Sequence, residues 1–388
     1  MKKKIVILGS TGSIGKTFFS ILKKDYKNID IFLLTANSNY KELLKQVKFF
    51  NVKNIIIANK LKFEVVKKIL KNKKINVYNN FDSMGSIFKN NKIDYTMSAI
   101  SGLEGLRPTL KMIKYTKKIA IANKESIICG WPLILKKLKL NKTEFIPIDS
   151  EHFSIWSLIN KTKDVNIEKI FITASGGPFN NYPLKKFNLI TKKKALNHPN
   201  WKMGKKITID SATMMNKVFE IIEAKKIFNF DYNKLSILVH PKSYVHAIVK
   251  FKNGLTKILI HDTNMTIPIF NSLYPNFQKN IKSNDLDFSI INNLNFNKLD
   301  EVKFPVVKIL KNLPKKDSLY ETVIVTTNDL LVNMFLENKI KFIDISKNLL
   351  KIIKSKEFKK YKRIIPKNVA QIEQLSEYVR LKIRSLSI

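Results

Sequence analysis

The segment KIVILGSTGSIG, residues 4–15, decides how the chain begins to fold. Its apolar run at residues 5–8 is typical of a buried strand, and Gly9, Gly12 and Gly15 lead into a patterned segment at residues 13–24. We therefore expect a strand, a tight glycine loop and a helix. Backbone N–H groups at such a helix start attract pyrophosphate, so the loop predicts a nucleotide site. Its spacing, G-x-x-G-x-x-G, differs from the G-x-G-x-x-G fingerprint, and a glycine turn that binds no nucleotide is the alternative.

The same alternation continues over the first 149 residues, where Lys-rich amphipathic stretches separate further apolar runs. These runs fall at residues 29–36, 54–58, 95–100, 119–122 and 143–149. Continuous apolar strands that alternate with helices indicate a parallel sheet covered on both faces. We expect an α/β fold in which residues 1–149 form a doubly wound, Rossmann-like domain. The second run ends at Asn37 without an acidic residue for a ribose 2′-hydroxyl, which favours NADP over NAD.

The rest of the chain has a different pattern of predicted helices, strands and turns. Residues 150–274 combine glycine turns, a helical stretch at 213–229 and alternating strands at 235–251 and 255–261, which predicts an α+β catalytic domain. Residues 275–300 are rich in Asn, Asp and Lys and predict a linker. Residues 301–388 predict a C-terminal helical domain, with helices at 302–313, 321–338, 345–355 and 368–386.

Composition limits the function classes. The 388 residues carry 71 Lys+Arg against 30 Asp+Glu, a net charge of +41, yet only four are arginine and the lysines are dispersed. This pattern indicates a solvated basic surface and no specific nucleic-acid binding. Apolar runs are far shorter than the roughly 18 residues that a membrane span needs. The single cysteine, Cys129, fits a reducing compartment, and residues 5–8 are too short for a signal-peptide core, so we expect a cytoplasmic protein.

A group of carboxylates predicts a metal site. Asp149 and Glu151 follow a strand at an i, i+2 spacing, which places both side chains on one side, about 6–7 Å apart. A solvated loop pair is the alternative. The helix at 213–229 offers Glu220 as a third carboxylate, on one face with Asn216 and Lys217. Oxygen ligands suit Mg²⁺ or Mn²⁺ better than Zn²⁺.

Two further segments predict an anion site. Ser175-Gly176-Gly177 can form a backbone nest, and Ser211 is expected at the start of the helix that carries Asn216. Either serine also fits a plain turn or an N-cap. The loop from His198 to Gly204 contains an aromatic residue and a glycine hinge, which suggests a lid, although a structural histidine is the alternative.

Taken together and in order, these motifs resemble the 1-deoxy-D-xylulose 5-phosphate reductoisomerase family. The matching segments are GSTGSIG at 9–15, ANKES at 122–126, PIDSEH at 147–152, ASGGPF at 174–179, HPNWKMG at 198–204, DSATMMNK at 210–217 and VHPKSYVH at 239–246. The segment at 326–345 also looks like the helical domain of that family. The resemblance implies isomerisation of a phosphorylated ketose and reduction of the resulting aldehyde to 2-C-methyl-D-erythritol 4-phosphate, for isoprenoid synthesis.

The resemblance also implies cofactors and residue roles: NADPH, a divalent ion that is Mg²⁺, Mn²⁺ or Co²⁺, and a homodimer. It assigns the ion to Asp149, Glu151 and Glu220. It assigns the substrate phosphate to Ser175, His198, Ser211, Asn216 and Lys217, and the reacting hydroxyls to Lys124 and Ser150. It places Trp201 and Met203 in a closing flap. The NADPH contacts it implies are Thr11, Gly12, Ser13, Ile14, Asn37, Ser38, Asn39, Asn123, Glu125 and Gly204.

The chain departs from the family pattern in two places. Asn37 and Ser38 stand where Gly and a basic residue are usual, and Asn264 and Thr266 replace the usual Asp and Arg. Two other functions remain open: a different NADP-dependent, metal-assisted dehydrogenase of a phosphorylated substrate, and a basic nucleic-acid-binding protein with a degenerate nucleotide fold. The three carboxylates and the Ser-Gly-Gly segment argue against the second, and turnover of the ketose phosphate would exclude the first.

Overall fold

The computed structural model describes residues 2–89, 91–159, 166–275 and 279–385. Parts of the predicted linker, residues 276–278, and of the predicted C-terminal domain, residues 386–388, lie outside these ranges. The chain forms two compact units. Unit 1 comprises Met1–Ile127, Leu133–Asp149 and Met265–Ile281, and unit 2 comprises Ile128–Pro132, Ser150–Asn264 and Lys282–Ile388.

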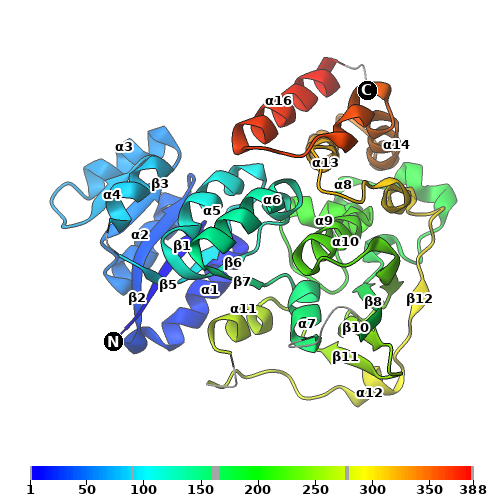
Figure 1. The fold of residues 1–388 in the computed structure, drawn as a ribbon, viewed down its shortest axis with the longest axis horizontal. Coiled ribbons are helices and arrows are strands. Elements are labelled where there is room, and N and C mark those ends of the chain that lie inside the picture. The colour runs from blue at the N-terminus through cyan, green and yellow to red at the C-terminus, as the bar shows by residue number, and fades with distance from the viewer. Residues whose placement is uncertain (1, 90, 160–165, 276–278, 386–388) are drawn as a thin grey trace. The chain divides into compact units, whose positions relative to one another are not determined.

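Unit 1 is built on a seven-stranded parallel sheet with the order β4-β3-β2-β1-β5-β6-β7 (Figure 1). Its strands are β1 (Lys3–Leu8), β2 (Ile29–Ala36), β3 (Asn54–Ile57), β4 (Asn76–Tyr78), β5 (Ile93–Ser98), β6 (Thr116–Ile121) and β7 (Glu144–Pro147). Ile5 to Leu8 are fully buried in the centre of the sheet, as their apolar character requires. The strand order reverses between β1 and β5, and ligands of such sheets bind at the carboxyl ends of the strands at this point.

Helices follow the first six strands in turn: α1 (Ser13–Lys24), α2 (Tyr40–Phe50), α3 (Lys60–Ile69), α4 (Met84–Phe88), α5 (Leu106–Ile113) and α6 (Lys124–Asn141), of which Ile128–Pro132 belong to unit 2. Helix α11 (Thr266–Leu273) joins unit 1 from later in the chain. The close approach of β1 to α1 depends on glycine. A Cβ at Gly15 would lie 2.3 Å from the carbonyl oxygen of Gly9, and Gly9 itself has a φ of +78°. Side chains at these two positions would push strand and helix apart.

Unit 2 contains a five-stranded mixed sheet with the order β11-β10-β8-β9-β12. The strands are β8 (Ile167–Ala174), β9 (Leu235–Val239), β10 (Val245–Phe251), β11 (Thr256–Ile260) and β12 (Asn297–Lys298). Strands β8 and β9 are parallel, and the other pairs are antiparallel. Ile170 and Ile172 of β8 pack in one cluster with Ile221 and Ala224 of helix α10 (Met215–Phe228), so this sheet supports one of the helices of the candidate site.

The helices of unit 2 are α7 (Ser150–Leu158), α8 (Lys192–Ala195), α9 (Lys205–Ala212), α10 (Met215–Phe228), α12 (Phe288–Asn292), α13 (Tyr320–Leu336), α14 (Phe342–Ile353), α15 (Lys356–Lys359) and α16 (Val369–Ser385). Helix α13 is almost entirely buried, because it packs against α14, α16 and α9 (Figure 1). Its apolar residues lie on all sides of the helix, as burial requires, and it also buries the polar residues Glu321, Thr322, Thr326, Thr327, Asn328 and Asp329.

The structure differs from the sequence-based expectations in several places. The segment expected to be a linker, residues 275–300, contains α12 and also β12, which pairs with β9 in the sheet of unit 2. The helix expected at 213–229 starts at Met215 and is separated from α9 by Met214, which has a left-handed φ of +68°. The helix expected at 302–313 is a 3₁₀ helix, Pro305–Asn312, that begins at a proline. The segment Met265–Ile281 belongs to unit 1, because Ile269, Phe270 and Leu273 of α11 join the core of that unit.

Cys129 lies in the middle of α6 and is buried, and this burial raises the pKa of its thiol. Within the described residues, the structure has no helix with the length and apolar character that a membrane span requires.

Candidate functional site

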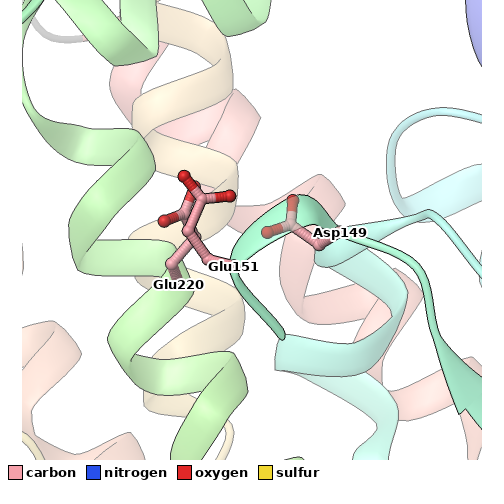
Figure 2. A group of neighbouring side chains, drawn as sticks. All are labelled: Asp149, Glu151 and Glu220. Atoms are coloured by element: carbon pink, nitrogen blue, oxygen red, sulfur yellow. The ribbon is translucent and has the colours of Figure 1, made fainter. Parts of the chain in front are cut away.

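Three carboxylates converge at the start of α7 and in the second turn of α10. Glu151 lies on α7 and Glu220 on α10, while Asp149 precedes α7 by one residue, so the chain itself holds it beside Glu151 (Figure 2). One oxygen from each carboxylate lies within 4.8 Å of the others. Side-chain exposure is 15% for Asp149, 11% for Glu151 and 1% for Glu220. Three nearly buried carboxylates at this separation repel one another unless a cation compensates them.

Lysine ammonium groups supply positive charge to this cluster. Lys217 Nζ lies 2.5 Å from Glu151 Oε1 and 2.6 Å from Glu220 Oε2, and Lys124 Nζ lies 2.6 Å from Asp149 Oδ2. Asn216 Nδ2 donates to Glu220 Oε1 at 2.5 Å. The cluster therefore accommodates cations, and its oxygen-only donors fit a hard divalent ion such as Mg²⁺ or Mn²⁺.

Ser175, His198 and Ser211, which were predicted to bind an anion, lie in contact with one another. His198 Nε2 lies 3.1 Å from both serine hydroxyls. His198 Nδ1 accepts hydrogen bonds from the backbone N–H groups of Asn200, at 3.1 Å, and Trp201, at 3.0 Å. Because Nδ1 accepts two hydrogen bonds, the proton of the neutral ring is on Nε2, which points it toward the serines.

The charge state of His198 follows from its surroundings. Burial and the nearby Lys217 ammonium lower the pKa of His198 to about 4. At neutral pH the ring is an uncharged hydrogen-bond donor, and the positive charge on this side of the site comes from Lys217.

Two backbone features place the serines. Gly176 and Gly177 both have left-handed φ values, +84° and +63°, and Gly177 N donates to Ser175 Oγ at 3.0 Å. A Cβ on Gly176 would lie 2.6 Å from the side chain of Asn180. The expectation that Ser211 begins the helix carrying Asn216 was wrong: Ser211 lies in the last turn of α9, and the left-handed Met214 separates the two helices.

The predicted flap, residues 198–204, is fixed at its base. Asn200 Nδ2 donates to the Pro241 carbonyl oxygen at 2.6 Å and to Ser243 Oγ at 2.8 Å. The Trp201 ring stands edge-on to His246, with centroids 6.0 Å apart. Gly204 then caps α9, and a Cβ there would have nothing within 4 Å. The loop is thus held by hydrogen bonds at Asn200, while the space around Gly204 leaves its other end room to move.

The glycine loop that was predicted to bind a nucleotide, residues 9–15, begins at the carboxyl end of β1. Helix α1 starts after Gly12 with no side-chain cap and no acidic residue in its first turn, which leaves its dipole suited to an anion. Gly12 and Ser13 are exposed, as are Asn37, Ser38 and Asn39 after β2.

The polar side chains near this loop also have structural partners. Asn39 Oδ1 caps α2 by accepting from Glu42 N at 3.3 Å, and Asn123 Oδ1 caps α6 by accepting from Ser126 N at 2.7 Å. Asn123 Nδ2 also donates to the Gly102 carbonyl oxygen at 2.5 Å. A cofactor on this surface would meet exposed backbone and hydroxyl groups more than free amide side chains.

Comparison with known proteins identifies the family. Models of 1-deoxy-D-xylulose 5-phosphate reductoisomerase match residues 5–130, and models of its C-terminal domains match residues 145–228 and 261–382. The chain is 63% identical over 387 residues to the 1-deoxy-D-xylulose 5-phosphate reductoisomerase of Pelagibacter ubique (strain HTCC1062), with full coverage of both. This chain belongs to that family. As a family member it is an oxidoreductase that converts 1-deoxy-D-xylulose 5-phosphate to 2-C-methyl-D-erythritol 4-phosphate.

Other members of the family agree over nearly the whole chain. The reductoisomerase of Sulfurihydrogenibium sp. (strain YO3AOP1) is 38% identical over 359 residues, 92% of each protein. The reductoisomerase from Zymomonas mobilis, solved in complex with NADPH, superposes with a TM-score of 0.89 at 30% identity and full coverage of both chains. A reductoisomerase solved with NADPH, fosmidomycin and magnesium gives a TM-score of 0.90 at 28% identity, covering 99% of this chain and 98% of the other.

Most of the residues predicted for metal and substrate are thus brought together around α7, α9 and α10. Lys217 was expected beside the phosphate serines, but its ammonium contacts Glu151 and Glu220 directly. Ser150 Oγ likewise donates to Glu151.

Sequence reasoning missed His152, which is fully buried behind the carboxylates. His152 Nε2 lies 2.9 Å from the Glu220 carbonyl oxygen, and Nδ1 lies 3.3 Å from Glu223 Oε2. Its position directly after Glu151 was the only signal available in the sequence.

Proposed function

We propose that Asp149, Glu151 and Glu220 hold the divalent cation with which, together with NADPH, this chain carries out its family reaction. The observation that carries the proposal is the convergence of these carboxylates within 4.8 Å, with Lys217 bridging two of them. A divalent ion bound there supplies Lewis-acid stabilisation of charge on the substrate oxygens. NADPH supplies the hydride that reduces the aldehyde.

The side chains around the carboxylates are suited to binding the substrate phosphate and hydroxyls and to excluding water. Ser175, Ser211 and the Nε2–H of His198 offer neutral donors to the substrate phosphate, and Lys217 adds positive charge nearby. Lys124, which is 10% exposed on its side chain, can donate to a substrate hydroxyl while it is held against Asp149. The Trp201 flap, anchored at Asn200, would exclude water from this region.

The proposed NADPH site is the loop at residues 9–15 together with the ends of β2 and β6. The uncapped start of α1 fits the pyrophosphate, and the absence of an acidic residue after β2 fits a 2′-phosphate. The residues we assign to it are Thr11, Gly12, Ser13, Ile14, Asn37, Ser38, Asn39, Asn123, Glu125 and Gly204. We also propose a homodimer, from the family resemblance, and a cytoplasmic location, which the single reduced cysteine fits.

The decisive experiment mixes purified protein with 1-deoxy-D-xylulose 5-phosphate, Mg²⁺ and NADPH, and follows the loss of NADPH absorbance. We expect turnover that disappears with EDTA and returns with Mg²⁺ or Mn²⁺. Unphosphorylated 1-deoxy-D-xylulose should be a poor substrate, and Ser211→Ala should raise KM for the phosphorylated one. Absence of turnover with both metals would contradict the proposal. Size-exclusion chromatography with light scattering tests the dimer.

A further inference from the structure

Helix α13 carries buried polar residues that the reaction does not use directly. Asn328 is fully buried and Asp329 is 8% exposed, and both lie on a helix whose residues are almost all buried. Buried polar groups are costly unless they have specific partners. Their partners lie on α9, the helix that carries Ser211.

The contacts form one connected network. Asn328 Nδ2 donates to Asp210 Oδ1 at 2.7 Å. Lys206 Nζ lies 3.3 Å from Asp210 Oδ2 and 2.9 Å from Asp329 Oδ1. The Asp210 side chain is 3% exposed, so both of its oxygens are bound inside the protein. Helix α13 therefore contacts α9 at two places: at Asp210, in the last turn of α9, and at Lys206, one turn earlier.

The position of these contacts matters because Asp210 directly precedes Ser211. Ser211 Oγ lies 3.1 Å from His198 Nε2, and the Ser211 carbonyl accepts from Met214 N at 3.1 Å, where the chain turns toward α10. A shift of the last turn of α9 would move the Ser211 hydroxyl and the turn together. Such a displacement of a binding group weakens substrate binding strongly even when it is small.

We propose that Asn328 and Asp329 are positioning residues for substrate phosphate, acting through Asp210 and Lys206 on Ser211. The C-terminal helices thereby set the geometry of the phosphate site. This inference rests on the proposed role of Ser211, and the test separates the two.

A second buried network supplies a matched control. Glu321, on the same helix α13, lies 3.1 Å from Lys226 Nζ near the end of α10, and its side chain is 2% exposed. Lys226 is nine residues beyond Lys217 on α10, which is roughly 13 Å along a helix. Glu321→Gln therefore perturbs a buried polar contact of α13 without touching α9.

The experiment compares steady-state kinetics and thermal unfolding of Asn328→Leu, Glu321→Gln and Ser211→Ala. We expect Asn328→Leu to raise KM for 1-deoxy-D-xylulose 5-phosphate about tenfold, with kcat and the KM for NADPH nearly unchanged. The inhibition constant of inorganic phosphate should rise by the same factor. Glu321→Gln should lower the melting temperature but leave the KM for 1-deoxy-D-xylulose 5-phosphate and the inhibition constant of phosphate unchanged.

Exchanging the side chains of Asp210 and Asn328 tests whether the contact between them can be restored. Asn328→Asp alone places a second carboxylate against Asp210 and should raise KM further, whereas Asp210→Asn/Asn328→Asp restores a donor and an acceptor and should return KM toward the wild-type value. If Ser211→Ala raises KM but Asn328→Leu does not, or if Glu321→Gln raises it equally, the positioning role is wrong. If Ser211→Ala leaves KM unchanged, the proposed role of Ser211 fails instead.

Discussion

Replacement of Lys217 by methionine tests how the carboxylate cluster is stabilised. The Lys217 ammonium contacts Glu151 and Glu220 at 2.5 and 2.6 Å, and the three side chains are 8%, 11% and 1% exposed. Removing one partner of a buried ion pair costs about 3–5 kcal/mol. Here one ammonium compensates two carboxylates, so we expect Lys217→Met to lie toward the upper end of that range.

Thermal unfolding of the metal-free protein measures this cost. A free-energy loss of 1 kcal/mol lowers the melting temperature by about 2–4 °C for a cooperative unit of this size, so the variant should melt roughly 10–20 °C lower in EDTA. Mg²⁺ or Mn²⁺ should recover most of the loss, because a divalent ion compensates the same carboxylates and its stabilisation grows with concentration. The metal-induced shift should therefore be larger for the variant than for the wild type.

Lys225→Met is the matched control, because Lys225 lies on the same helix and its ammonium donates to the Phe230 carbonyl oxygen. It should melt near the wild type, with an ordinary metal shift. The reasoning is refuted if Lys217→Met melts within about 2 °C of the wild type in EDTA, or if its metal-induced shift is no larger.

Three further outcomes follow from the site. Glu220→Gln should nearly abolish metal-dependent turnover while the circular dichroism spectrum stays unchanged, and wild-type activity with wild-type metal dependence would contradict the metal assignment. Because the pKa of His198 is lowered to about 4, the folded state binds fewer protons than the unfolded state between about pH 6.5 and 4, so stability should fall as the pH drops through this window. Denaturant titrations should show a shallower fall for His198→Asn. Ser38→Arg should tighten NADPH binding and leave NADH binding almost unchanged, as kcat/KM for both cofactors would show, and better use of NADH by the wild type would overturn the preference for NADP.

The local structure that could be predicted from the sequence depends on strong local signals. The start of the chain is one example: apolar residues 5–8, the glycine turn and the patterned helix match β1 and α1, because each signal acts over a few residues. The carboxylate cluster could be predicted from the sequence for the same reason. Asp149 and Glu151 are only two residues apart in the chain, and Glu220 lies on a helix whose periodicity placed it on one face with Asn216 and Lys217.

The rest depends on contacts that no local pattern reveals. Methionine has no preference for left-handed backbone, so the break at Met214 and the true place of Ser211 were hidden. The hydrogen bond from Asn328 to Asp210 joins residues 118 positions apart, and nothing in the sequence around either one indicates it. The direct contact of Lys217 with the carboxylates also required the packing of α7 against α10, which only the tertiary structure supplies.

The burial of Cys129 makes this protein convenient for site-directed labelling. Thiol reagents attack the thiolate, and a raised thiol pKa inside helix α6 keeps the natural cysteine unreactive while the protein is folded. A cysteine introduced at an exposed position, for example at Lys202 in the flap, would then carry a fluorophore without background from the wild-type sequence. The closure that we propose for residues 198–204 can accordingly be tested optically, without prior removal of Cys129.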